Sequence, residues 1–208
     1  MAKLIYVESS PRKSRSHSIK IARLFLDVYA KVNPNDDIQT IDLWSKDLPA
    51  FNEEKLNAKY SLMHGQNMSE SEQEAWKEIK SIFNEFNDAD KYVFSVPMWN
   101  FGVPYTLKHY IDVITQPGLA WTFSPDDGFK GLVEGKALAI YATGGSYAAG
   151  SESEAFDLQK PSFEGWLGFI GLTDVSRLVM APTLATPEDL ASQEAVLTQD
   201  AERLAETF

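Results

Sequence analysis

A loop rich in hydroxyl groups and positive charge follows the first apolar segment of the chain. The stretch Glu8–Ser18 is ESSPRKSRSHS and carries Ser10, Ser16, His17 and Ser18. A helical pattern begins at its end, and the free N–H groups and partial positive charge of a helix N-terminus bind phosphate. The glycines of the dinucleotide and P-loop motifs are absent, and hydroxyls in their place favour a terminal monophosphate. The alternative is a serine-rich surface loop with ordinary helix capping.

A second loop combines aromatic side chains with an amide. Pro97–Pro104 is PMWNFGVP and places Met98, Trp99, Asn100 and Phe101 directly after an aromatic, β-branched segment. Aromatic side chains at such a place suit the face of a flat ligand, and the amide and backbone N–H groups suit its polar edge. The alternative is that the two aromatic rings only cover the end of the core.

A third loop contains paired glycines. Thr143, Gly144 and Gly145 follow the apolar segment ALAIYA. Glycine permits positive φ and lets backbone amides approach a ligand closely, so this loop is a candidate wall of the same site. The alternative is a plain turn.

The elements that position these loops alternate between strand and helix. Strands are expected at Lys3–Val7, Asp37–Leu43, Tyr92–Val96, Ala137–Ala142 and Asp174–Met180. Helical periodicity is expected at 18–31, behind a capping box at Ser69 and Glu72, at 105–115, within 154–170 and after a Thr186 cap. This alternation predicts one α/β domain over 1–208, with a parallel sheet and irregular stretches at 50–69 and 116–136. Ligands of such sheets bind beyond the carboxyl ends of the strands, where all three loops lie.

Composition restricts the classes of function. The chain of 208 residues has no Cys, three His and a formal net charge of −11. Disulfides, thiolate metal sites and cysteine nucleophiles are excluded, and a histidine-rich metal site is not expected. The acidity argues against nucleic acid or an anionic membrane as partner, and the N-terminal segment lacks the layout of a signal peptide, so we expect a cytoplasmic protein. Between Ser9 and Lys20, however, four basic residues occur without an acid, which suits a pocket for one small anion.

A phosphate at one loop and a flat ring across two others describe a flavin mononucleotide. Pro97–Asp112, PMWNFGVPYTLKHYID, resembles the signature of the flavodoxin-like NAD(P)H:quinone oxidoreductases and FMN-dependent NADH-azoreductases. SSPR with SRSHS resembles the phosphate loop of that family, LAWTF its substrate-pocket loop, and FEGWLGFIGLTDV its late helix and strand. The sequence departs from the azoreductase pattern at Ala142-Thr143, where Ser-Arg is frequent, and at Trp99, where Tyr is common.

The resemblance implies a fold and an activity. The fold is a flavodoxin-like three-layer sandwich with a five-stranded parallel sheet of order 2-1-3-4-5. The activity is FMN-dependent reduction of quinones and reductive cleavage of azo bonds by ping-pong hydride transfer from NADH or NADPH. Quinones, azo or nitroaromatic compounds are the implied acceptors, and a homodimer is the implied assembly. No side chain need act as nucleophile or metal ligand, because the flavin carries the chemistry.

The resemblance also assigns roles to residues. The FMN phosphate would lie at Ser10, Ser16, His17 and Ser18, and the ring and ribityl chain at Met98, Trp99, Asn100 and Phe101. Thr143, Gly144 and Gly145 would lie at the pyrimidine edge. Candidates for an apolar substrate lid, or equally for plain core, are Phe123, Phe163 and Phe169, and weaker candidates for proton donors are Tyr147 and His64.

Two other classes of function compete with this interpretation. A flavodoxin-type electron carrier acting on protein partners suits the acidity, but carriers are typically shorter and lack the stretches 50–69 and 116–136. A receiver-type regulatory domain needs an acidic cluster at the strand ends, whereas the first strand here continues into Glu8-Ser-Ser-Pro.

Overall fold

The computed structural model describes residues 1–208 and contains a five-stranded parallel sheet. Its strands are β1 (Lys3–Glu8), β2 (Asp37–Asp42), β3 (Lys91–Pro97), β6 (Lys136–Ala142) and β7 (Asp174–Met180). They lie in the order β2-β1-β3-β6-β7, and every neighbouring pair is parallel. Counted along the chain, this is the predicted order 2-1-3-4-5, so the predicted sheet is confirmed.

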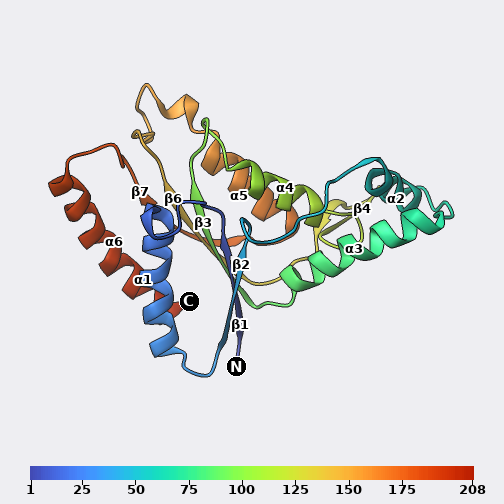
Figure 1. Cartoon of the computed structure of the whole chain (residues 1–208), viewed down its shortest axis with the longest axis horizontal. Helices are drawn as coiled ribbons and strands as arrows, with labels where there is room; N and C mark the ends of the chain where they lie inside the picture. Colours follow the sequence, from blue (N-terminus) through green and yellow to red (C-terminus); the bar gives the residue numbers. More distant parts are fainter.

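Helices cover both faces of this sheet (Figure 1). One face is covered by α1 (His17–Val32) and α6 (Pro187–Thr207), and the other by α3 (Glu70–Asn87), α4 (Tyr105–Ile114) and α5 (Gln159–Ile170). The three layers of the predicted sandwich are therefore present. None of the helices combines the length and the apolar composition that crossing a bilayer requires.

The sheet is buried on both faces because successive side chains of its central strands enter two different cores. In β1, Leu4 and Tyr6 pack with α1 and α6, whereas Ile5 and Val7 pack with the helices of the opposite layer. Each such side chain contributes about 1.5–3 kcal/mol when fully buried. This double burial explains why the strands have nearly continuous apolar sequences rather than alternating ones.

Two stretches expected to be irregular contain regular structure. The stretch 50–69 includes α2 (Glu53–Met63), whose cap Asn52 accepts a hydrogen bond from the Lys55 backbone. The stretch 116–136 includes an antiparallel hairpin of β4 (Trp121–Ser124) and β5 (Gly128–Gly131). The helix α2 and the adjoining end of α3 project from the body of the molecule (Figure 1).

Two helix starts follow the capping chemistry that the sequence predicts, and one expected helix is divided. The capping box of Ser69 and Glu72 is formed, and Thr186 accepts a hydrogen bond from the backbone of Asp189. The helix expected within 154–170 is in fact divided. A short 3-10 turn at Glu154–Phe156 comes first, and α5 begins only at Gln159.

Candidate functional site

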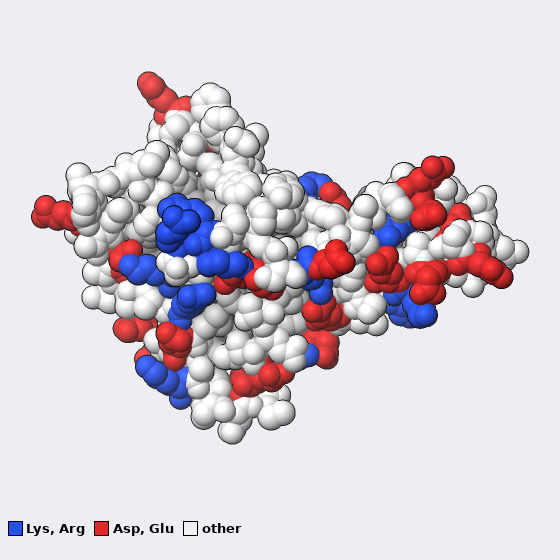
Figure 2. Space-filling view, viewed as in Figure 1, with Lys and Arg blue, Asp and Glu red and all other residues white.

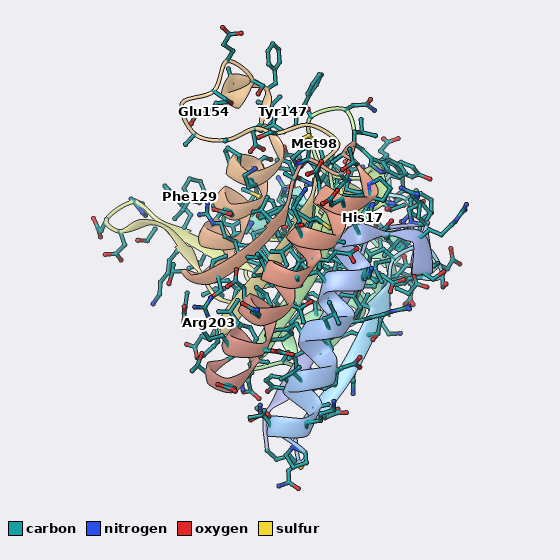
Figure 3. All side chains as sticks on the ribbon, turned by 90° about the vertical axis from the view of Figure 1, so that its left-hand side faces the viewer. His17, Met98, Phe129, Tyr147, Glu154 and Arg203 are labelled. Carbon is teal, nitrogen blue, oxygen red and sulfur yellow. The ribbon has the colours of Figure 1, made fainter.

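Three loops meet at the carboxyl edge of the sheet because β1, β3 and β6 are neighbours. In register, Glu8 lies beside Ser95, and Pro97 lies beside Ala142. The loops that follow these strands therefore start side by side, as the sequence predicts. Figure 3 shows His17, Met98 and Tyr147, one from each loop region, toward the same end of the molecule.

The first loop carries buried hydroxyls at the start of α1. Ser10, Ser16 and Ser18 are all buried, and the Oγ atoms of Ser16 and Ser18 lie 3.2 Å apart. Ser16 is the N-cap residue, but its side chain makes no capping hydrogen bond, which argues against the alternative of ordinary helix capping. The first backbone N–H groups of α1 find no carbonyl acceptor, and its first turn contains no acid. Hydroxyls and N–H groups are thus left available to an anion.

The positive charge of this loop is only partly neutralised by the chain itself. Lys13 pairs with Glu8 and Asp42, and Lys20 pairs with Glu194. Arg12 and Arg15 are exposed and form no ion pair. Figure 2 shows Lys and Arg side chains gathered around the start of α1, whereas Asp and Glu are prominent on the projecting α2–α3 region. A local positive site is thus present on an acidic protein.

His17 is the first residue of α1 and is half-buried. Burial lowers the pKa of its imidazole below the ordinary value of 6.5. The cations Arg12 and Lys20 lower this pKa further, while Glu194 acts in the opposite direction. The neutral imidazole is therefore favoured when the loop holds no anion.

The second loop contains a tight turn in a conformation that few side chains adopt. Asn100 and Phe101 have φ angles of 48° and 70°, and the backbones of Trp99 and Gly102 exchange hydrogen bonds of 2.9 and 3.0 Å. Asparagine tolerates positive φ, but the bulky Phe101 does so at a cost. The N–H groups of both central residues have no acceptor within the chain. The turn therefore presents two donors at the sheet edge.

An aromatic cluster flanks this turn. The ring of Trp99 lies 5.8 Å from Trp44 and 6.1 Å from Tyr105, and Trp44 donates a hydrogen bond of 3.0 Å from Nε1 to the carbonyl of Ser9. Trp44 thus connects the first and second loops. The sequence-based prediction does not include Trp44, although it lies two residues beyond the end of β2, where the rule that ligands bind at carboxyl strand ends applies equally.

The third loop differs in detail from the expectation. Gly144 and Gly145 do not have positive φ. A Cβ at Gly145 would meet only the Tyr147 ring, at 3.6 Å, so the chain itself does not require glycine at this position. The hydroxyl of Thr143 is directed inward and donates to the carbonyl of Gly145 at 2.7 Å. The carbonyls of Gly144 and Gly145 are thus occupied, the former by the N–H of Leu184, and only the N–H groups of the two glycines are left without an acceptor in the chain.

The three candidate lid residues separate into two groups. Phe163 is buried in the core against Phe94 and Trp166, which is the plain-core alternative. Phe123 and Phe169 are 55% and 37% exposed. Both lie in an exposed aromatic cluster around Phe129, whose ring is 4.9 Å from Phe123 and 5.8 Å from Phe169. We call Phe123, Phe129 and Phe169 the aromatic patch.

The two candidate proton donors lie in different places. Tyr147 stands beside the third loop and lines a cavity of about 480 Å³ with mainly polar neighbours. Four charged groups of that cavity pair with one another, Lys160 with Asp157 and Arg177 with Glu164, and a fifth, Glu154, accepts a hydrogen bond from the N–H of Gly150. His64 lies at the end of α2, stacked on Tyr60, and within the chain it does not join the three loops.

Comparison with known proteins places this geometry in a family. The family model described as a flavodoxin-like fold matches residues 2–207. The chain belongs to this family. A protein of Desulfotalea psychrophila named FMN-dependent NADH:quinone oxidoreductase is 46% identical over 198 residues, covering 95% of this chain and 92% of the relative. A protein of the same name from Nitratidesulfovibrio vulgaris is 42% identical, with complete coverage of both chains.

Solved structures agree with this assignment. The azoreductase from Bacillus anthracis str. Sterne superposes with a TM-score of 0.90 at 26% identity, and the match covers all of both chains. A second solved structure is that of an FMN-dependent NADH-azoreductase from Bacillus anthracis str. Ames Ancestor in complex with FMN. It gives a TM-score of 0.85 at 25% identity and covers 99% of this chain and all of the other. The resemblance stated from the Pro97–Asp112 motif is confirmed.

Proposed function

We propose that this protein is an FMN-dependent NADH oxidoreductase that reduces quinones to hydroquinones and cleaves azo bonds reductively. Donor and acceptor bind in turn to one open face, in a ping-pong cycle. The observation that carries the proposal is the convergence of unpartnered donors from two loops at one sheet edge, the start of α1 and the Asn100-Phe101 turn. The named relatives support the choice of FMN, NADH and quinone.

The first loop fits the phosphate of FMN. Ser10, Ser16 and Ser18 provide buried hydroxyls, and the N-terminus of α1 provides free N–H groups. These hydroxyls and N–H groups stabilise a phosphate dianion, as do the unpaired Arg12 and Arg15 nearby. The chain offers this site no competing acid in the first turn of α1.

The second and third loops fit the flat ring system. Met98 and Trp99 provide apolar surface, and the N–H groups of Asn100 and Phe101 are directed to no acceptor of the chain. When bound, FMN supplies the atom that accepts hydride from NADH and passes reducing equivalents to the acceptor. Backbone donors held in a fixed turn stabilise negative charge that develops on a ring without reorganising first. Gly144 and Gly145 close the opposite edge.

The aromatic patch supports a homodimer and an apolar substrate pocket. Phe123, Phe129 and Phe169 form one cluster, and Phe129 is 63% exposed. Contiguous exposed aromatic surface marks an interaction site, and aromatic rings are enriched in interface cores. A second copy of the chain would bury this surface and offer Phe123 or Phe169 to flat acceptors such as quinones, azo dyes and nitroaromatics.

Steady-state turnover tests the proposal. The FMN-loaded protein is expected to oxidise NADH in the presence of a quinone or an azo dye. Double-reciprocal plots of initial rate against NADH concentration, at several acceptor concentrations, are expected to give the parallel lines of a ping-pong mechanism. A protein that binds FMN but oxidises no NADH with any quinone or azo acceptor would instead match the electron-carrier alternative.

A further inference from the structure

Lys13 occupies an unusual backbone position in the first loop. Its φ is 49°, in the left-handed region that non-glycine residues rarely adopt. Its carbonyl accepts a hydrogen bond of 3.0 Å from the N–H of Ser16, so this conformation determines where Ser16 and the start of α1 lie. No side chain of the loop other than Lys13 is anchored by an ion pair to the strands.

Two carboxylates hold Lys13 in this position. Its Nζ lies 2.7 Å from Oε1 of Glu8 and 2.5 Å from Oδ1 of Asp42. Glu8 and Asp42 end the neighbouring strands β1 and β2 and face each other in register. Asp42 is fixed in turn by hydrogen bonds from the Ser45 hydroxyl and the Trp44 backbone. We call Glu8, Lys13 and Asp42 the Lys13 cluster.

The Lys13 cluster also reduces an electrostatic obstacle. Glu8 and Asp42 place two negative charges at the sheet edge where the phosphate is expected to bind. Glu8 has a second cation, Arg23, at 4.0 Å, whereas Lys13 is the one ion-pair partner of Asp42. Burial by itself raises the pKa of Asp42, but the hydrogen bond from Lys13, with those from Ser45 and Trp44, outweighs burial and lowers it. Asp42 is therefore ionised, and its charge needs the ammonium group of Lys13 as a partner.

We propose that Lys13 is a positioning residue for the phosphate of the cofactor. Held by Glu8 and Asp42, it fixes the loop in the conformation that aligns Ser16 and Ser18, and it offsets one of the two negative charges that these carboxylates carry. Lys13 itself is occupied by these carboxylates, so it acts through the loop rather than as a direct ligand. This inference rests on the proposed function, because it concerns the same phosphate site.

The test compares FMN with riboflavin, which has the same ring system and no phosphate. Apo-protein is titrated with each flavin, and binding is followed by the change in flavin fluorescence. Lys13→Met removes the ammonium group, and Lys13→Gly also removes the strain of positive φ. Lys13→Arg keeps a cation that reaches both carboxylates. The matched control is Lys20→Met, which removes one positive charge from the same helix start but breaks only the pair with Glu194.

Lys13→Met and Lys13→Gly are each expected to raise the Kd for FMN about tenfold or more, because the loop loses its anchor and Asp42 is left as an unpaired negative charge near the phosphate. Riboflavin binding is expected to stay within about twofold. Lys13→Arg is expected to restore most of the FMN affinity. Adding Asp42→Asn to Lys13→Met is expected to recover affinity, because it removes an unpaired carboxylate. Amide hydrogen exchange of residues 13–18 in the apo-protein is expected to speed up in Lys13→Met and not in Lys20→Met.

Three results would overturn the inference. One is an FMN affinity of Lys13→Met that equals that of Lys20→Met. The second is an equal loss for FMN and riboflavin, which would mean that Lys13 supports the fold generally. The third is a wild-type protein that binds neither flavin, which overturns the proposed function as well. The first two leave FMN binding by the wild type intact, so the two failures are distinguishable.

Discussion

At the scale of single residues, the most specific feature of the site is the pair of hydroxyls at the start of α1. Ser16 and Ser18 are buried, yet their Oγ atoms have only each other as partners, 3.2 Å apart. Buried polar groups are normally satisfied, so an incoming acceptor such as phosphate completes this pair. These free hydroxyls are the basis for our proposal that the start of α1 binds phosphate.

Replacing Ser16 and Ser18 together by Ala is expected to raise the Kd for FMN by at least about tenfold, because hydrogen bonds to charged groups contribute about 1.5–3 kcal/mol. The free energy of unfolding of the apo-protein should change by less than about 1 kcal/mol, since Ser16 makes no capping bond. Fluorescence titration and urea unfolding measure the two quantities. Ser14→Ala, at an exposed position in the same loop, is the control. An unchanged FMN affinity in the double variant would show that the phosphate does not bind at this loop.

The pKa of His17 gives a second prediction at this scale. In the apo-protein burial holds this pKa below 6.5. Because the pKa of His17 is lower in the folded protein than in the unfolded chain, the unfolded chain takes up the proton first as pH falls. His17 therefore lowers the free energy of unfolding at acid pH, and this free energy rises with pH between the folded and the unfolded pKa. A phosphate bound at the start of α1 favours the imidazolium and raises the pKa.

Proton NMR titration of the imidazole tests this prediction. The His17 resonance should titrate below pH 6.5 without FMN and at a higher pH with FMN. His109, whose Nε2 lies 2.8 Å from the carbonyl of Pro49, provides a second resonance away from α1. A His17 pKa that is unchanged by FMN, or that falls, would show that the phosphate lies elsewhere.

At the scale of elements, the sequence predicts the strands that have apolar runs and the helices that begin at a capping residue. The central strands β1, β3 and β6 are predictable because both of their faces are buried. The helix starts at Ser69 and Thr186 are predictable because their capping residues form the expected hydrogen bonds. The helix α2 was missed because its buried positions are Lys55, Ala58 and Ser61, which form no apolar stripe. The β4–β5 hairpin was missed because its strands have only four residues each.

The sequence also predicts that the three candidate loops meet, whereas their roles in binding stay predictions. The rule that ligands bind beyond the carboxyl ends of strands located all three loops. The positive φ of Phe101 was not predictable, because phenylalanine has no preference for that region and tertiary contacts impose it. The partners of Lys13 were also hidden, since Glu8 and Asp42 come together only when β1 and β2 pair.

The β4–β5 hairpin owes its position to a close backbone contact. A Cβ on Gly131 would lie 2.2 Å from the backbone nitrogen of Gly171 at the end of α5. Gly131→Ala is therefore expected to lower the free energy of unfolding by about 1–3 kcal/mol and to displace Phe129 from Phe169. Urea unfolding measures the change in the free energy of unfolding. Lys130→Ala, at an exposed position of the same strand, is the control. Equal free energies of unfolding for the two variants would contradict the claim that the backbone of Gly171 leaves no room for a Cβ at Gly131.

At the scale of the whole molecule, the aromatic patch and the three loops belong to one proposed assembly. The helices α1 and α6 cover one face of the sheet, while the patch lies beside α5 in the opposite layer (Figure 1). In Figure 3 the hairpin that carries Phe129 extends from the body. Such a projection, apolar at Phe123 and Phe129, is suited to contact with a second copy of the chain.

Charge introduced into the aromatic patch is expected to weaken this assembly. Phe129→Asp should shift the mass measured by light scattering from that of a dimer toward that of a monomer, because a buried unpaired charge is costly. Val196→Asp is the control, since Val196 is similarly exposed (59%) but lies on α6 in the other helical layer. A wild-type protein that is already monomeric, or a Phe129→Asp variant that remains fully dimeric, would contradict the proposed interface.

The central claim is that the three loops at the carboxyl edge of the sheet form one FMN site. The most direct measurement is the amount of flavin held by the reconstituted protein after gel filtration, determined from its absorption spectrum. We predict one FMN per chain, with tighter binding of FMN than of riboflavin because the phosphate contributes. A colourless protein after reconstitution, or equal affinity for the two flavins, would contradict the account.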